Sequence, residues 1–361
     1  MIKLKKWISS ILVLSLCTSV LAGCTGDKTN SGKDENEKKE EIAVETSQVN
    51  SLMSQIDEEL QKQLAPMPEE GKKEKVGVLI ISLTNQFWAN MKKCYEEAAE
   101  KLDIEIDVVA APTEGDTASQ LEALDAMIAK DYDAIIVSPI EGTNLIPGVV
   151  RANQKGTPII NLGPGFNKEA LEAADGVLDA KITVDFQEQG KMVAKDMVDR
   201  IKAGEVAIIQ GLPGAGQSEG RTNGAKEYFE GAKDIELVNV QPADWDRNKA
   251  YEITKNLIQS NPELKGIFAC NDVMALGAIE ALEDAGKKDV LVYGVDFTND
   301  AKEAIKAGKM MGSITYSSAA YTKAGLLLAM KVAQGQEIDK PIYSPLTLVN
   351  QDNINEFENW K

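Results

Sequence analysis

The sequence predicts an α/β fold of two lobes, each built on a parallel sheet with helices on both faces. Short apolar runs alternate with longer amphipathic runs from Lys75 onward, a pattern typical of strands joined by crossover helices. The series starts again at Val206, and the repeated stretch is longer than one hydrophobic core usually supports. We therefore expect two lobes.

Both series give definite ranges. The expected strands of the first are Val76 to Ser82, Ile104 to Ala110, Ala134 to Ser138 and Pro158 to Leu162, with helices near Gln86 to Leu102, Asp116 to Ala129 and Asn144 to Asn153. Those of the second are Val206 to Gln210, Glu236 to Val240, Ile267 to Cys270 and Val290 to Val295, with helices near Glu219 to Gly231, Arg247 to Gln259, Val273 to Glu283 and Asp300 to Ala307.

The stretch from Gly266 to Asp296 carries the clearest functional signal. One apolar strand ends at Asn271, where a helix begins, and the next strand ends at Asp296. Two strands joined by a helix of this length are parallel neighbours, so Asn271 and Asp296 meet at the carboxyl edge of one sheet. Open α/β sheets bind ligands at that edge.

Three further segments connect the lobes or extend them. Lys181 to Asp185 reads as a strand followed by a helix whose cap is Asp185. Gly312 to Tyr316, a helix from about Ser318 to Ala333 and Ile342 to Val349 follow the second series. They either extend the second lobe or carry the chain back across the gap, which would give a multi-stranded hinge.

Residues 1–24 have the pattern of an export signal. Three lysines precede an apolar core, and Leu21-Ala22-Gly23 stands before Cys24. This resembles a bacterial lipoprotein signal, which implies cleavage before Cys24, lipidation of that cysteine and attachment to the outer face of the cell membrane. An uncleaved membrane helix is the alternative, but the apolar run is short for spanning.

Residues 25–74 read as a disordered or partly helical tether. Thr25 to Glu45 has almost no side chain to bury, which predicts disorder. Leu52, Ile56, Leu60 and Leu64 allow a short helix that Pro66 would end, but a solvated spacer is the preferred interpretation.

Composition excludes several function classes. The net charge is −18, so clustered phosphate contacts with nucleic acid are not expected. The chain has no histidine, which removes Ser-His-Asp and Cys-His catalysis and every metal site that needs histidine. Cys94 and Cys270 fall in different lobes and read as buried small hydrophobes. We expect no cofactor and no metal.

Three motifs carry a resemblance to a known family. They are Gln241 to Arg247, Asn271 to Ala278, and Gly286 to Val290 with Gly294-Val295-Asp296. From Lys75 to about Val349 the chain resembles type I periplasmic binding proteins of the ribose-binding family, the solute receptors of ABC sugar importers. The resemblance implies two Rossmann-like lobes, residues 75–183 with 317–344 and residues 184–316 with 345–361, joined by a three-segment hinge that closes over a ligand.

The resemblance also implies a set of ligand-binding residues. Asn85, Phe87 and Trp88 match a family segment in which an asparagine bonds a hydroxyl and aromatic rings stack, although Gln86 replaces its proline. Trp245 matches the aromatic residue of the opposite lobe, Arg221 the arginine that bonds sugar hydroxyls, and Asn271 with Asp296 the remaining polar pair. Tyr316 stands where the ribose binder has glutamine.

A sugar independently favours such groups, because its hydroxyl rim needs planar hydrogen-bonding groups and its C–H faces fit aromatic rings. Each residue also has a structural alternative: Phe87 or Trp88 as a core anchor, Asn271 as a helix cap only, and Asp296 with Arg221 as a structural ion pair. Where the family carries Asp-Arg after the fourth strand, this chain has Gly163-Pro164. The identity of the sugar is therefore open, and ribose is not assured.

The predicted function is capture of a sugar or sugar-like molecule for an ABC importer. The expected partners are that ligand, a membrane permease and the membrane itself through Cys24, for a monomer without enzymatic activity. A sensory receptor of the same fold is the alternative, and a secreted carbohydrate enzyme is disfavoured because Asp296 is the only acid placed in the cleft.

Overall fold

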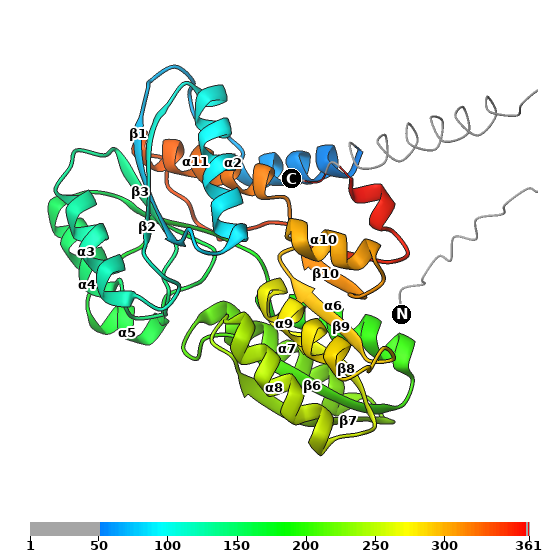
Figure 1. Cartoon of the computed structure of the whole chain (residues 1–361). Helices are drawn as coiled ribbons and strands as arrows, with labels where there is room; N and C mark the ends of the chain where they lie inside the picture. The colour runs from blue at the N-terminus through cyan, green and yellow to red at the C-terminus, as the bar shows by residue number, and fades with distance from the viewer. Residues whose placement is uncertain (1–50, 359, 361) are drawn as a thin grey trace, which may run out of the picture. The chain divides into compact units, whose positions relative to one another are not determined.

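The computed structural model describes residues 51–358 and residue 360, and these fold into two α/β lobes (Figure 1). Lipidation of Cys24 and the signal segment lie outside the described residues. No helix within the described part of the chain is long and apolar enough to cross a membrane.

The first sheet has six parallel strands in the order β11-β5-β4-β3-β1-β2. The strands are β1 (Lys75–Ser82), β2 (Glu105–Ala111), β3 (Ala134–Val137), β4 (Ile159–Leu162), β5 (Ala180–Thr183) and β11 (Ile342–Tyr343). One face carries α2 (Gln86–Leu102) and α11 (Ser318–Ala333), and the other carries α3 (Thr117–Ile128), α4 (Ile146–Lys155) and α5 (Lys168–Ala173) (Figure 1). Wholly buried aliphatic strands are what a sheet covered on both faces requires.

The second sheet repeats this topology in the order β12-β10-β9-β8-β6-β7. Its strands are β6 (Gly204–Gln210), β7 (Ile235–Pro242), β8 (Leu264–Ala269), β9 (Leu291–Val295), β10 (Gly312–Thr315) and β12 (Thr347–Asn350), of which only β12 runs antiparallel. The helices are α6 (Phe186–Ile201), α7 (Gly216–Gly231), α8 (Arg247–Ser260), α9 (Asp272–Asp284) and α10 (Asn299–Lys306), followed by a 3₁₀ turn, η1 (Ile354–Phe357). One buried cluster fills this lobe.

The chain crosses between the sheets after β5, after β10 and after β11. After β10 it returns through α11, which packs on α2 and the first sheet, and β11 pairs with β5. Of the segments after β10, α11 and β11 therefore belong to the first lobe and β12 to the second, so the chain does return across the gap, as the multi-stranded hinge alternative predicted. Asp185 caps α6 as predicted, since its Oδ1 accepts the Glu188 N–H at 2.9 Å.

Residues 51–64 form a helix that packs on the first lobe, so the solvated spacer preferred from the sequence is wrong for them. Ile56, Leu60 and Leu64 are each at most 2% exposed and belong to the core of that lobe. Their spacing of four residues places them on one helical face, and the first sheet's helices supply the apolar surface that covers it. We call residues 51–64 the docked helix.

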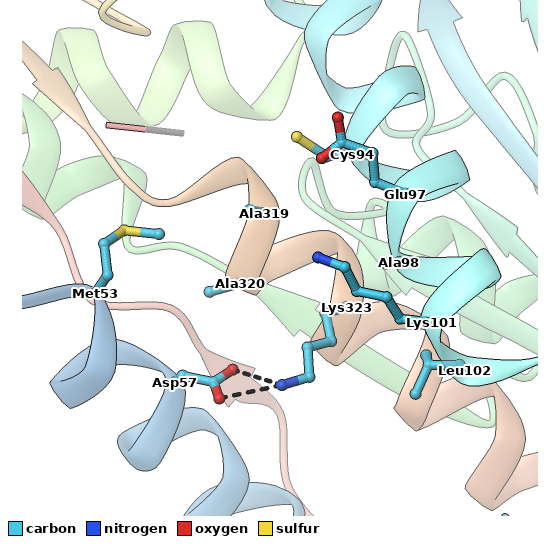
Figure 2. A pocket seen from close by; sticks show the side chains of 10 residues that line it. All are labelled: Met53, Asp57, Cys94, Glu97, Ala98, Lys101, Leu102, Ala319, Ala320 and Lys323. Atoms are coloured by element: carbon cyan, nitrogen blue, oxygen red, sulfur yellow. Dashed lines mark hydrogen bonds and ion pairs between the residues drawn. The ribbon is translucent and has the colours of Figure 1, made fainter. Parts of the chain in front are cut away.

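Polar contacts hold the docked helix beside α11 and β11. The buried Lys331 ammonium donates to the carbonyl oxygens of Leu64 and Pro66. The Gln63 side chain pairs with both backbone groups of Tyr343, at 3.0 and 2.9 Å. A cavity of about 280 Å³ remains between the docked helix, α2 and α11, and Figure 2 shows Asp57 bridging to Lys323 beside it.

Candidate binding site between the lobes

The first wall of the site begins at Asn85, directly after β1. Its Oδ1 accepts the Phe87 N–H at 2.9 Å and so caps α2, while its Nδ2 donates to Glu114 Oε1 at 3.2 Å. Glu114 lies in the loop after β2, which pairs with β1, so the carboxyl ends of two neighbouring strands bring these side chains together. Both ends of the Asn85 amide are therefore held in place.

Three aromatic rings adjoin this wall. Phe87 meets Trp88 edge to face at 5.0 Å between ring centroids and meets Tyr316 at 5.9 Å. All three are nearly buried and belong to the core of the first lobe, so the structural alternative of core anchoring holds for Phe87 and Trp88. Burial and the nearby Asp296 carboxylate raise the pKa of Tyr316, which places that hydroxyl close to the acidic group of the second lobe.

The second wall is organised around Arg221 in α7. Its Nε donates to Gln189 Oε1 at 2.8 Å and its Nη1 to the Cys270 carbonyl at 2.7 Å. Its Nη2 lies 3.6 Å from Asp296 Oδ1, and both side chains are buried. The ion pair given as the structural alternative is present, and three polar partners hold the guanidinium in one orientation.

Asn271 and Asp296 follow the neighbouring strands β8 and β9, as the sequence predicts. Asn271 Oδ1 accepts the Met274 N–H at 2.9 Å, so it does cap α9. Asp296 has a φ of 113°, a backbone conformation that L-residues seldom adopt and that often marks ligand-binding positions. Burial raises the pKa of Asp296, and the Arg221 guanidinium opposes that rise.

Trp245 is held in a second unusual conformation, with φ of 64°. Its ring lies flat against Gly211 at the end of β6, where a Cβ would come within 2.1 Å of the ring. Trp245 follows β7 and Cys270 follows β8, and both strands are neighbours of β6. The Trp245 ring therefore lies at the same edge of the sheet as the Cys270 carbonyl that Arg221 binds. Glycine at 211 is what allows the ring this position.

Two acids near the site were missed from the sequence. Asp272 is fully buried and accepts the Thr298 N–H at 2.7 Å and the Ser313 hydroxyl at 2.8 Å, so it joins α9 to the cap of α10 and to β10. Burial, and then the Asp296 charge, raise the pKa of Asp272 well above its ordinary value. Asp296 therefore has a second acid close to it, behind the surface of the cleft.

Glu114 is the second missed acid. Protein groups surround its carboxyl although part of the side chain still faces solvent. Burial raises the pKa of Glu114 to about 7, hydrogen bonds from Asn85 and Trp88 lower it, Asp296 raises it and Arg221 lowers it. Glu114 thus shares one electrostatic neighbourhood with both walls. The sequence signal that could have found Glu114 is its position as an acid in the loop that follows the second strand.

The structure brings Asn85, Trp88 and Glu114 of the first lobe close to Arg221 and Asp296 of the second, with Phe87 and Tyr316 beside them. Gln86 Oε1 also accepts the Asn299 N–H at 2.7 Å across the gap. A cavity of about 250 Å³ is bordered by Phe87, Asp296 and Thr315. Asn271 and Trp245 stand on the same edge of the second sheet but make none of these cross-lobe contacts.

The loop after β4 confirms the departure seen in the sequence. Gly163 has a φ of 81°, and the buried Asn161 Nδ2 donates to the Pro164 carbonyl at 2.7 Å. This position offers a backbone turn and no charged side chain. Among the described residues no cluster of three or more metal-ligating side chains occurs.

The comparisons with known proteins fit this geometry. The family described as periplasmic binding protein domain matches residues 76–337. The chain belongs to this family. Members are binding proteins and not enzymes. The D-allose-binding periplasmic protein of Escherichia coli (strain K12) is 38% identical over 72% of this chain and 85% of its own length. A ribose import binding protein of Bacillus subtilis (strain 168) is 29% identical over 76% of this chain and 87% of its own.

Solved structures agree on the fold. A solute-binding protein of an ABC transporter from Actinobacillus succinogenes 130z, with bound D-allose, has a TM-score of 0.74 and 35% identity, covering 78% of this chain and 99% of its own. One from Bacillus halodurans C-125, with bound myo-inositol, has a TM-score of 0.71 and 28% identity, covering 80% and 98%. The two-lobed periplasmic binding protein fold predicted from the sequence is confirmed.

Proposed function

We propose that this protein captures a monosaccharide or cyclic polyol between its lobes and delivers it to an ABC importer. The observation that carries the proposal is the convergence of Asn85 and Glu114 from one lobe with Arg221 and Asp296 from the other. A sugar ring offers hydroxyls of both hydrogen-bonding senses, and this set supplies an amide, a guanidinium and two carboxyls.

Each side chain has a defined part in the proposal. Arg221 donates to ring hydroxyls with the guanidinium hydrogens left by Gln189 and the Cys270 carbonyl, and Asp296 accepts from them. Asn271 uses its Nδ2, since its Oδ1 serves the cap of α9. The rings of Phe87, Trp88, Trp245 and Tyr316 face the C–H surfaces of the ligand, in addition to their packing.

The chemistry favours an uncharged, hydroxyl-rich ligand. Arg221 already has Asp296 as counter-ion, and the loop at Gly163-Pro164 adds no charge. The relatives named for D-allose and the solved relative with myo-inositol fit a six-membered ring. We therefore rank D-allose ahead of D-ribose as the first ligand to test.

We further propose that the lobes rotate about the three crossing segments when the ligand binds, and that lipidated Cys24 holds the protein on the outer face of the membrane as a monomer. Two separate sheets joined by three crossings of the chain support rotation. The lipid anchor rests on the pattern before Cys24 alone. Mass spectrometry of the amino-terminal peptide from its native host tests it, and an unmodified Cys24 would contradict it.

Calorimetric titration of the chain lacking residues 1–24 with D-allose, D-ribose and myo-inositol tests the function. We expect saturable 1:1 binding of at least one of them and a rise in the unfolding temperature that grows with ligand concentration. Absence of heat and of thermal shift with the whole set would refute sugar capture. Stimulated transport in vesicles containing the cognate permease distinguishes import from signalling through another membrane protein.

A further inference from the structure

Glu114 lies beside the proposed ligand-binding residues but was given no role among them. It stands in the loop between β2 and α3, and the register of β1 with β2 brings that loop beside Asn85 and Trp88. Its Oε1 receives the Asn85 Nδ2 at 3.2 Å, and the Trp88 side chain also hydrogen-bonds to the carboxyl. A carboxylate accepts about four hydrogen bonds, so acceptor capacity is left over.

We propose that Glu114 is a further ligand-positioning and specificity residue of the cleft, which orients Asn85 and Trp88 and accepts a hydroxyl of the ligand with its remaining lone pairs. This inference rests on the proposed function. The Asn85 Oδ1 already accepts the cap hydrogen bond of α2 and its Nδ2 donates to Glu114, so Glu114 adds acceptor capacity that Asn85 does not supply to the first wall.

The charges around Glu114 give the site a dependence on pH. Those that act on its carboxyl are Arg221 of α7 and Asp296 after β9, together with the neutral donors Asn85 and Trp88. Burial raises the pKa of Glu114 to about 7, so a substantial share of the empty protein carries a proton there at neutral pH. A ligand hydroxyl that donates to the carboxylate favours the ionised form.

Two consequences follow from linkage. Ligand capture should release part of a proton near pH 7, and affinity should be higher at pH 8 than at pH 6. A ligand that lacks the hydroxyl meeting Glu114 should lose both the affinity and the proton release. Selection among epimers then depends on which ring hydroxyl faces the first wall.

The test is calorimetric titration with D-allose from pH 6 to 8, in two buffers of different ionisation enthalpy, for the chain without residues 1–24, Glu114→Gln and Glu122→Gln. Glu122 is an exposed residue of α3 and is the matched control, expected to behave as the parent. For Glu114→Gln we expect a dissociation constant raised about 10-fold or more. The number of protons that this variant releases on binding D-allose should fall, and what remains should come from Asp296, whose pKa burial also raises.

The outcomes separate this inference from the proposed function. Binding of D-allose by the parent with an affinity and proton release unchanged in Glu114→Gln would overturn the role of Glu114 and leave sugar capture standing. A parent that binds D-allose without exchanging any proton between pH 6 and 8 would overturn it too, even if the variant fails to fold. No binding of any sugar by the folded parent would overturn both.

Discussion

The two walls of the proposed binding cleft are held in position by different means. On the first lobe, Phe87 and Trp88 are extensions of the core, and Asn85 is fixed by a helix cap and by Glu114. On the second lobe, Arg221 is a buried charge held by Gln189, the Cys270 carbonyl and Asp296. Packing sets the position of one wall and electrostatics that of the other. Substitutions should therefore fail in different ways.

The largest effect is expected from the buried charge. Asp296→Ala leaves the Arg221 guanidinium in a buried position without its counter-ion and removes an acceptor for the ligand. We expect a loss of about 4 kcal/mol in the free energy of sugar binding, measured by calorimetry. Asp300→Ala, an exposed acid of α10, is the control. A loss under tenfold in affinity would show that the charged wall does not dominate.

The docked helix buries Ile56, Leu60 and Leu64 in the core of the first lobe, and truncating one of these side chains tests how much that packing contributes to stability. Leu60→Ala leaves a cavity in a position that is 1% exposed. We expect the free energy of unfolding to fall by about 3 kcal/mol, measured by denaturant titration. Glu59→Ala, the exposed neighbour, should change it by about 0.5 kcal/mol or less. Equal effects of the two substitutions would mean that the helix is not docked in solution.

The ring of Trp245 packs against the end of β6 in the second wall, where Gly211 leaves room for it. Gly211→Ala places a Cβ within 2.1 Å of that ring. We expect about 2 kcal/mol of lost stability together with weaker sugar binding, because the ring must move. Gly231→Ala is the matched control, since a Cβ there meets no atom within 4 Å. Retained affinity and stability in Gly211→Ala would place the Trp245 ring elsewhere.

The pH dependence of stability sharpens the same comparison. Burial raises the pKa of Glu114 from 4.5 to about 7, so the folded protein holds that proton more tightly than the unfolded chain. The stabilising contribution is complete below about pH 4.5 and is lost as pH rises through 7. Part of the side chain faces solvent, so we expect about 1 kcal/mol, measured by urea unfolding from pH 4 to 8.

Glu114→Gln should flatten this part of the stability profile, while Glu122→Gln should leave it as in the parent. An unchanged slope in Glu114→Gln would assign the titration to Asp272 or Asp296, whose pKa values burial also raises.

The smallest effect is expected from the ion pair of Asp57 with Lys323. The Lys323 Nζ lies 3.0 Å from Asp57 Oδ1, but each of the two side chains is more than a third exposed. Asp57→Asn should cost less than about 1 kcal/mol, and added salt should reduce the difference further. Thermal unfolding at low and high salt measures it. A loss of stability as large as that of Leu60→Ala would mean that this part-exposed ion pair contributes as much as a buried side chain.

Local patterns accounted for much of the site. Asn271 and Asp185 were predicted as helix caps where strands end, because capping needs a short polar side chain within three residues of the N–H it binds. Asn85 was placed by the family resemblance, and the structure shows that it also caps a helix. Glu114 had no such signal, since its partner Asn85 lies 29 residues away and meets it only through the pairing of β1 with β2. Asp272 is similar, because its partner Ser313 is 41 residues distant.

The sequence by itself determined the alternation of strands and helices, the division into two lobes and the polar residues at strand ends, since these depend on periodicity and on neighbours along the chain. Only the tertiary structure decided that the docked helix is buried, that Cys270 offers its carbonyl to Arg221, and that Glu114 joins the cleft. Burial and charge pairing arise between segments far apart in the chain, so their free energies exist only once the sheets have formed.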